Sequence, residues 1–177
     1  NCQVYRGYAL AGSTSSWLQI LADPLYQIFQ ASELWPRLRE VIDFWKDDLV
    51  HLMPFLQPVL GPARPSQDWE TNAHERALQG IAALLEILPR PDCPVLLLLD
   101  DIQWIDPFSR DLLLKLAKSG AIAGLTLVAA GRSQEVSPAL QDWGQSILLE
   151  PLDREASHSL IKSMTESCPA EVRDWLV

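Results

Sequence analysis

The sequence predicts a three-layer α/β fold in which a parallel sheet is covered on both faces and a helical insert is added. Two apolar runs, residues 95–99 and 125–130, are typical of buried strands, and each is followed at once by polar residues. Helical patterns alternate with these runs, and such alternation favours parallel strands with helices on both faces. Hydrophobic residues make up 48% of the 177 residues, enough for a substantial core.

The composition excludes several functional classes. With 14 basic and 23 acidic residues, the net charge of −9 argues against a direct nucleic-acid surface. The three cysteines are far apart and form no CxxC pair, so we expect free thiols in a reducing cytoplasm. The apolar run at 95–99 is far shorter than the ~20 residues that span a bilayer, and no signal peptide is visible, so we expect no membrane association.

The first half of the chain predicts one strand followed mainly by helices. The expected elements are a strand over 2–10, helices over 17–31, 34–52 and 72–88, and a proline-punctuated loop or broken helix over 54–68. We expect the first helix to break at Asp23 and restart at Pro24, since proline is tolerated in a first turn. Asn72 is expected to cap the last of these helices.

The second half continues the alternation. A helix is expected over 107–118, with Asp106 as its N-cap and Gly120 at its exit. After the strand at 125–130 the sequence predicts a short helix at 137–143, a third short strand at 146–149, and a helix from Asp153 to about Glu166.

Asp100 and Asp101 carry the clearest chemistry because they directly follow a strand that must be interior. Open parallel sheets bind ligands at the carboxyl ends of their strands. Adjacent side chains point in different directions, so one carboxylate can hold a hydrated Mg²⁺ while the other faces an attacking water. Arg132 ends the next strand at the same edge, where its guanidinium suits a phosphate or a salt bridge to one of the aspartates.

The stretches LLLLDDIQWIDPFSRDLLLKLA, LTLVAAGRS and LLEPLDREASHSLI together resemble a known family. The similarity is to the AAA/STAND class of P-loop ATPase domains, in the form found inside LuxR-type transcription regulators, bacterial adenylate cyclases and multidomain protein kinases. It is strong over residues 93–165 and weaker over 17–90. The resemblance implies ATP and Mg²⁺ as cofactors, with Asp100 coordinating the metal, Asp101 orienting the water, and Arg132 near the γ-phosphate.

The sequence departs from this family because it contains no GxxxxGK[ST] phosphate loop. We therefore expect a truncated ATPase module that is inactive alone and forms part of a larger cytoplasmic signalling protein. The expected parts are an edge strand and loop (1–16), a helical insert (17–92), the Walker B and sensor region (93–152) and the start of a helical region (153–177). Expected partners are the nucleotide, other domains of the parent chain, and further copies in ATP-dependent self-association.

A receiver domain and a catalytically degenerate scaffold are the main alternatives to an ATPase. A receiver domain also places two acids after a buried strand, but it needs an Asp and a Lys after later strands, which end here in Arg132 and Glu150. A catalytically degenerate scaffold for protein contacts would account for the seven tryptophans, although most of these lie in apolar patterns. The sequence has no HExxH or GxSxG motif for a metallohydrolase or a serine nucleophile.

Overall fold

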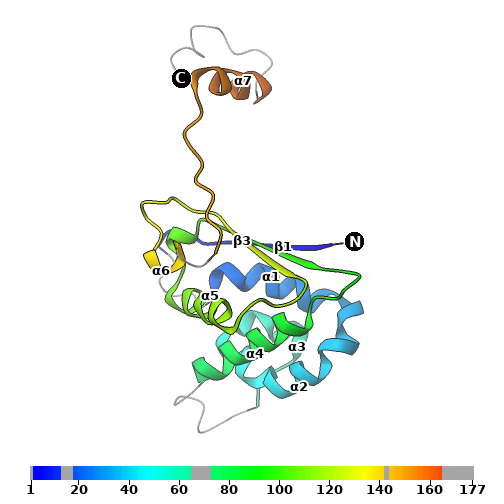
Figure 1. The fold of residues 1–177 in the computed structure, drawn as a ribbon. Coiled ribbons are helices and arrows are strands. Elements are labelled where there is room, and N and C mark those ends of the chain that lie inside the picture. Colours follow the sequence, from blue (N-terminus) through cyan, green and yellow to red (C-terminus); the bar gives the residue numbers. More distant parts are fainter. Residues whose placement is uncertain (1, 13–17, 65–72, 142–143, 165–177) are drawn as a thin grey trace. The chain divides into compact units, whose positions relative to one another are not determined.

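The computed structural model describes residues 2–12, 18–64, 73–141 and 144–164. The chain divides into two compact units, Asn1–Gln145 and Ser146–Val177, and each is described by itself. Figure 1 shows the first unit as a small sheet with helices packed against it. No helix within the described residues is long and apolar enough to cross a membrane.

The sheet has three parallel strands in the order β1-β2-β3. They are β1 (Gln3–Tyr8), β2 (Val95–Asp100) and β3 (Leu125–Ala129). All three were expected from the sequence, as was their parallel pairing. The fold class is therefore α/β, with the strand that ends in Asp100 at the centre of the sheet.

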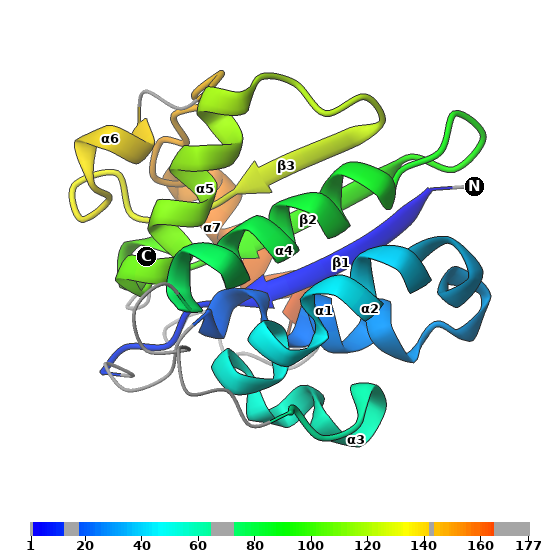
Figure 2. The ribbon, with the colours of Figure 1, turned by 90° about the horizontal axis from the view of Figure 1, so that it is seen from below.

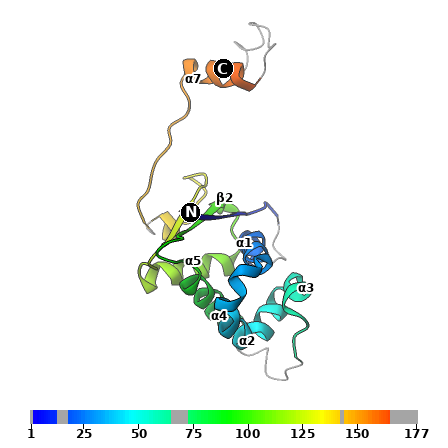
Figure 3. The same cartoon turned by 90° about the vertical axis from the view of Figure 1, so that its right-hand side faces the viewer.

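Within the first unit, helices α1, α4 and α5 lie on one face of this sheet, which we call the inner face. In register, Tyr5, Leu97 and Leu127 share the inner face, where Tyr5 and Leu97 are buried. Val4 and Val128, on the opposite or outer face, remain exposed. Figures 2 and 3 show α1, α4 and α5 on the same side of the strands. The expected cover on both faces is thus not seen within the described part of the first unit, and β3, expected to be buried, is only partly so.

Helices make up most of the remainder. Their bounds are α1 Gln19–Gln30, α2 Trp35–Leu52, α3 Gln57–Leu60, α4 Ala73–Ile87, α5 Pro107–Ser119, α6 Pro138–Gln141 and α7 Arg154–Met164, with 3₁₀ turns η1 Ser32–Leu34, η2 Pro54–Leu56 and η4 Ile102–Trp104. The sequence predicted α2, α4, α5 and α7 to within a few residues. The expected Asn72 cap lies outside the described residues.

Helix α1 runs unbroken through Pro24, so the expected break there is wrong. Proline 24 has no N–H to donate to the carbonyl of Ile20, one turn earlier. That carbonyl lies against Gly7 of β1, where an added Cβ would overlap with the Ile20 oxygen. The helix continues because burial of its apolar face, which includes Pro24 itself, outweighs one missing backbone hydrogen bond.

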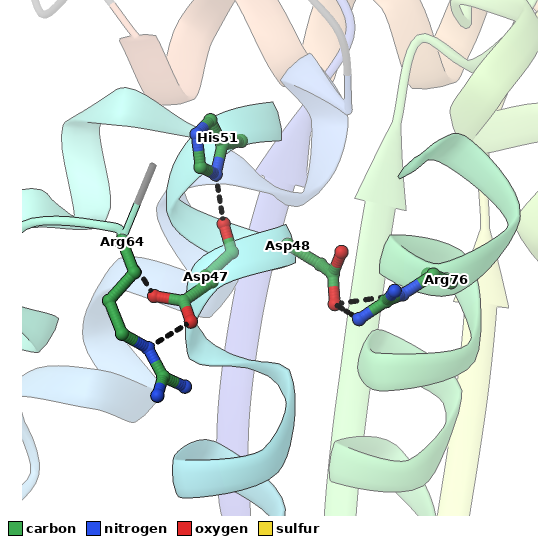
Figure 4. A network of polar contacts seen from close by, with 5 residues as sticks. All are labelled: Asp47, Asp48, His51, Arg64 and Arg76. Carbon is green, nitrogen blue, oxygen red and sulfur yellow. Dashed lines mark hydrogen bonds and ion pairs between the residues drawn. The ribbon is translucent and has the colours of Figure 1, made fainter. Parts of the chain in front are cut away.

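Charged side chains of α2 bind α4, the end of α4 and the segment that follows α3. Arg76 donates two hydrogen bonds to one oxygen of Asp48, at 2.9 and 3.2 Å, and Asp48 is only 8% exposed. Figure 4 shows this pair beside a second one, Asp47 with Arg64. At the C-terminus of α4, the Arg37 guanidinium donates to the carbonyl oxygens of Ile87, Leu88 and Pro89, which have no partner within the helix.

In the second unit, residues 146–149 do not form the expected strand. Ile147, Leu148 and Leu149 are 77, 74 and 85% exposed. An extended segment becomes a strand only when a neighbouring backbone accepts and donates its hydrogen bonds, and apolar residues alone cannot supply these. The helix that follows is confirmed, since the Asp153 carboxylate accepts the Ala156 N–H at 2.7 Å.

Candidate functional site

The two adjacent aspartates leave β2 in different environments, as the sequence predicted. Asp100 is the last residue of the strand and its side chain is exposed. Its Oδ1 accepts the N–H of Asp101 at 2.9 Å. Asp101 adopts a left-handed backbone conformation, with φ 56° and ψ 37°, which turns the chain out of the sheet into η4. Aspartate tolerates this conformation better than most residues, so the residue type suits the turn.

Arg132 lies in the loop that follows β3, beside the end of β2. Two backbone hydrogen bonds join these segments: Ala130 N–H donates to Leu99 at 2.8 Å, and Ile102 N–H donates to Ala130 at 3.0 Å. The main chain that carries Asp101 is thus tied to the main chain that precedes Arg132. This confirms that the two strand ends meet at one edge of the sheet.

The side chain of Arg132 has its own contacts in this loop. Its guanidinium lies 3.4 Å from the Glu135 carboxylate and 5.6 Å from the centre of the Trp104 ring. Among the described residues it forms no hydrogen bond or ion pair with Asp100 or Asp101, so the salt bridge left open by the sequence is not formed. The guanidinium is exposed and held by weak contacts, which leaves it able to turn toward an anion.

Gln103 is a contact residue that sequence reasoning did not single out. It donates its Nε2 to Asp101 Oδ1 at 3.0 Å and accepts the backbone N–H of Arg132 on Oε1 at 3.1 Å. It is part of the Gln-Trp pair that follows the two acids, so the family resemblance included it without giving it a role. The only signal in the sequence was its position two residues after Asp101.

Asp106 closes the loop that the two acids begin. Its Oδ1 accepts the Ser109 N–H at 3.0 Å, which confirms it as the N-cap of α5. Its Oδ2 also accepts the Ser109 hydroxyl at 2.5 Å, and its Oδ1 accepts the N–H of Leu18, which precedes α1, at 3.3 Å. The carboxylate therefore fixes the starts of two helices that are far apart in sequence.

The residues at this edge fit the metal part of a magnesium–nucleotide better than the phosphate part. Mg²⁺ is usually held by one or two carboxylates together with water and phosphate oxygens. The exposed Asp100 carboxylate meets that need, since one of its oxygens receives no hydrogen bond from the described residues. The described residues contain no group of three or more acidic, His or Cys side chains suited to a metal. No GxxxxGK[ST] loop is present in the sequence to surround the phosphates.

Two carboxyl groups on helices, those of Asp47 in α2 and Glu75 in α4, have lowered pKa values. Burial acts to raise the pKa of Asp47, but hydrogen bonds from the Arg64 backbone N–H and Nε outweigh it, so the pKa is lowered. The pKa of Glu75 is lowered chiefly by the hydrogen bond and charge of Lys115, 2.6 Å away. The first pair joins α2 to the chain after α3 and the second joins α4 to α5, and structural ion pairs of this kind need no functional explanation.

Comparison with protein-family models, with curated proteins and with solved structures found no match to this chain.

Proposed function

We propose that the chain supplies the magnesium-binding and water-orienting half of an ATP-binding, ATP-hydrolysing regulatory module within a larger cytoplasmic signalling protein. The observation that supports this most is the meeting of Asp100, Asp101 and Arg132 at the carboxyl edge of a parallel sheet. Ligands of open α/β sheets bind at this edge. A small parallel sheet with helices packed on it is also compatible with the truncated ATPase module that the resemblance implies.

Each residue in the proposal has a separate task. Asp100, with its exposed carboxylate, holds the metal ion. Asp101, whose carboxylate is half-buried and fixed by Gln103, orients the attacking water. Arg132 turns from Glu135 toward the γ-phosphate. Mg²⁺ bound with ATP supplies charge neutralisation on the phosphates. ATP binding then favours contact with a neighbouring domain or a further copy, and hydrolysis releases that contact.

The proposal can be tested with Mn²⁺ as a paramagnetic stand-in for Mg²⁺. In ¹H–¹⁵N spectra of the chain, Mn²⁺ with ATP is expected to broaden the amides of residues 100–104 and 130–132. Affinity is expected to be weaker than micromolar, because the sequence lacks the phosphate loop. Asp100→Asn is expected to abolish the local broadening, while Asp92→Asn, at an exposed aspartate of another loop, leaves it intact. Broadening that survives in Asp100→Asn, or micromolar ATP affinity of the unmodified chain, would contradict the proposal.

Asp101 is tested in a longer protein that carries this segment together with a GxxxxGK[ST] loop. There Asp101→Asn is expected to leave ATP bound but not hydrolysed, because the metal and phosphate contacts are retained and only the water loses its acceptor. Unchanged turnover in that variant would refute the role assigned to Asp101.

A scaffold without catalysis is the second candidate function, and the outer face of the sheet favours it. On this face Val4 and Tyr8 of β1 are 44 and 49% exposed, and Val128 of β3, on the other side of β2, is 48% exposed. Exposed apolar side chains that lie close together are typical of surfaces that bind other proteins. In the Mn²⁺ experiment, an absence of any ATP-dependent broadening at residues 100–104 would favour the scaffold over the ATPase module.

A further inference from the structure

The two ends of the Gln103 amide contact two different loops. The NH₂ end donates to the Asp101 carboxylate at 3.0 Å, and the carbonyl end accepts the Arg132 N–H at 3.1 Å. Only this orientation of the amide pairs a donor with an acceptor at both ends, since the reverse would place NH₂ against N–H and oxygen against carboxylate. The amide plane is therefore fixed by its contacts.

The backbone around Asp101 limits where its carboxylate can point. The left-handed conformation is held by two backbone bonds: Trp104 N–H donates to the Asp101 carbonyl at 2.9 Å, and Ile102 N–H donates to Ala130 at 3.0 Å. A residue with positive φ persists only when its surroundings determine it. With the backbone fixed, the hydrogen bond from Gln103 determines the direction of the Asp101 side chain.

Gly131 gives an independent indication that the Gln103 amide needs this place. An added Cβ on Gly131 would lie 2.9 Å from Gln103 Oε1, 2.8 Å from Ile102 Cγ1 and 2.9 Å from Val136 Cγ2. Any side chain at residue 131 would have to displace Gln103 or the apolar residues that flank it. The glycine thus leaves the space through which Gln103 reaches the Arg132 N–H.

We propose that Gln103 is a positioning residue that couples the Asp101 carboxylate to the main chain of Arg132. A change in the charge or direction of Asp101 alters the polarisation and position of the amide, and the amide transmits that change to the loop that carries Arg132. In the ATPase module proposed above, this would make the arginine respond to events at the water-orienting acid. That consequence rests on the proposed function, whereas the coupling itself exists without nucleotide.

The coupling is measured by a double-mutant cycle in ¹H–¹⁵N spectra recorded without nucleotide. Asp101→Asn keeps a residue that tolerates the left-handed turn, removes the charge and replaces one acceptor oxygen by NH₂. It is expected to shift the Arg132 amide resonance. In a Gln103→Leu background, which keeps the side-chain size and removes both hydrogen bonds, that shift is expected to fall to less than about a third.

Gln141→Leu is the matched control. Gln141 also holds this loop, through hydrogen bonds from its Nε2 to the Ser133 and Val136 carbonyls at 2.8 and 2.9 Å, but it does not contact Asp101. In that background the effect of Asp101→Asn on Arg132 is expected to persist. Equal shifts of the Arg132 amide in the Gln103 and Gln103→Leu backgrounds would overturn the proposal, because the charge would then act directly through space.

Amide exchange gives a second readout if Gln103→Leu perturbs folding. Gln103→Glu keeps an acceptor for the Arg132 N–H but replaces the donor toward Asp101 by a carboxylate, which the Asp101 charge repels. We expect exchange of the Arg132 amide to accelerate about fivefold in Gln103→Leu and much less in Gln103→Glu, as for loss of one hydrogen bond. Equal exchange rates in both variants and the unmodified chain would refute the coupling. Neither readout uses ATP, so a failure here is distinct from a failure of the Mn²⁺–ATP experiment.

Discussion

Replacing Asp106 by alanine should destabilise the first unit more than the loss of an ordinary helix cap. Removal of a capping side chain costs about 1 kcal/mol. Asp106→Ala also leaves the Ser109 hydroxyl, which is 0% exposed, without its acceptor, and a buried unsatisfied group costs about 1–3 kcal/mol. The longer contact from the Leu18 N–H adds a smaller amount. The expected loss in the free energy of unfolding is therefore about 2–4 kcal/mol.

Urea denaturation followed by tryptophan fluorescence and far-ultraviolet circular dichroism measures this loss. With a urea dependence of about 2 kcal/mol per molar, the midpoint should fall by about 1–2 M. Asp106→Asn provides a graded test, because asparagine is as good an N-cap as aspartate and keeps one acceptor oxygen. It should lose less than half as much stability as Asp106→Ala.

Asp111→Ala is the matched control for Asp106→Ala. Asp111 lies on the same helix, is exposed, and among the described residues accepts hydrogen bonds only from its neighbour Arg110, at 3.2–3.3 Å. Its removal should change stability by less than about 0.5 kcal/mol. The reasoning is refuted if Asp106→Ala costs no more than Asp111→Ala, or if Asp106→Asn is as damaging as alanine. The second result would mean that the single acceptor oxygen kept by asparagine does not retain the stabilisation assigned to the cap.

Three further outcomes follow from packing and charge. Gly7→Ala should unfold the first unit or lower its stability by several kcal/mol in the same urea assay, because the added methyl overlaps with the backbone of α1, whereas Gly144→Ala, at a position with open space, should not. Burial is the main cause that raises the pKa of Tyr5, so its stabilising contribution is present below pH 10 and is lost as the pH rises through the raised value. In absorbance titrations at 295 nm, Tyr5→Phe should remove a component that ionises above pH 10. The lowered pKa of Glu75 gives stability that is present above pH 4.5 and is lost as the pH falls through the lowered value. Lys115→Met should return this pKa toward its ordinary value in ¹³C NMR titrations, and an unchanged value would contradict the pairing.

The elements that the sequence predicted well are those determined by local interactions. The central strand β2 is a continuous apolar run, and α5 begins with an aspartate followed by proline, two signals that act within a few residues. The different environments of Asp100 and Asp101 also arise locally, because Asp100 ends the strand and the left-handed turn at Asp101 directs the next carboxylate to Gln103. For these features the nearest neighbours in sequence are the main physical determinants.

The features that were missed depend on contacts between distant segments. Pro24 was expected to break a helix, but the helix continues because its apolar face packs against β1. The apolar run at 146–149 was expected to form a strand, but apolar character does not provide the partner backbone that a strand needs. The contact of Gln103 with the Arg132 N–H joins residues 29 positions apart, and no periodicity encodes it.

The left-handed turn at Asp101 links the fold to the chemistry proposed for it. If β2 continued in regular extended form, Asp101 would point to the inner face, among buried residues such as Leu97 and Leu99, where an ionised carboxylate would be costly. The turn directs the carboxylate to Gln103 instead, while Asp100 stays exposed at the end of the strand. The two neighbouring carboxylates therefore differ: that of Asp100 is accessible to a metal ion, and that of Asp101 is fixed in direction. A bulky β-branched residue at 101 would be strained in this conformation, so the site depends on the backbone tolerance of aspartate as much as on its charge.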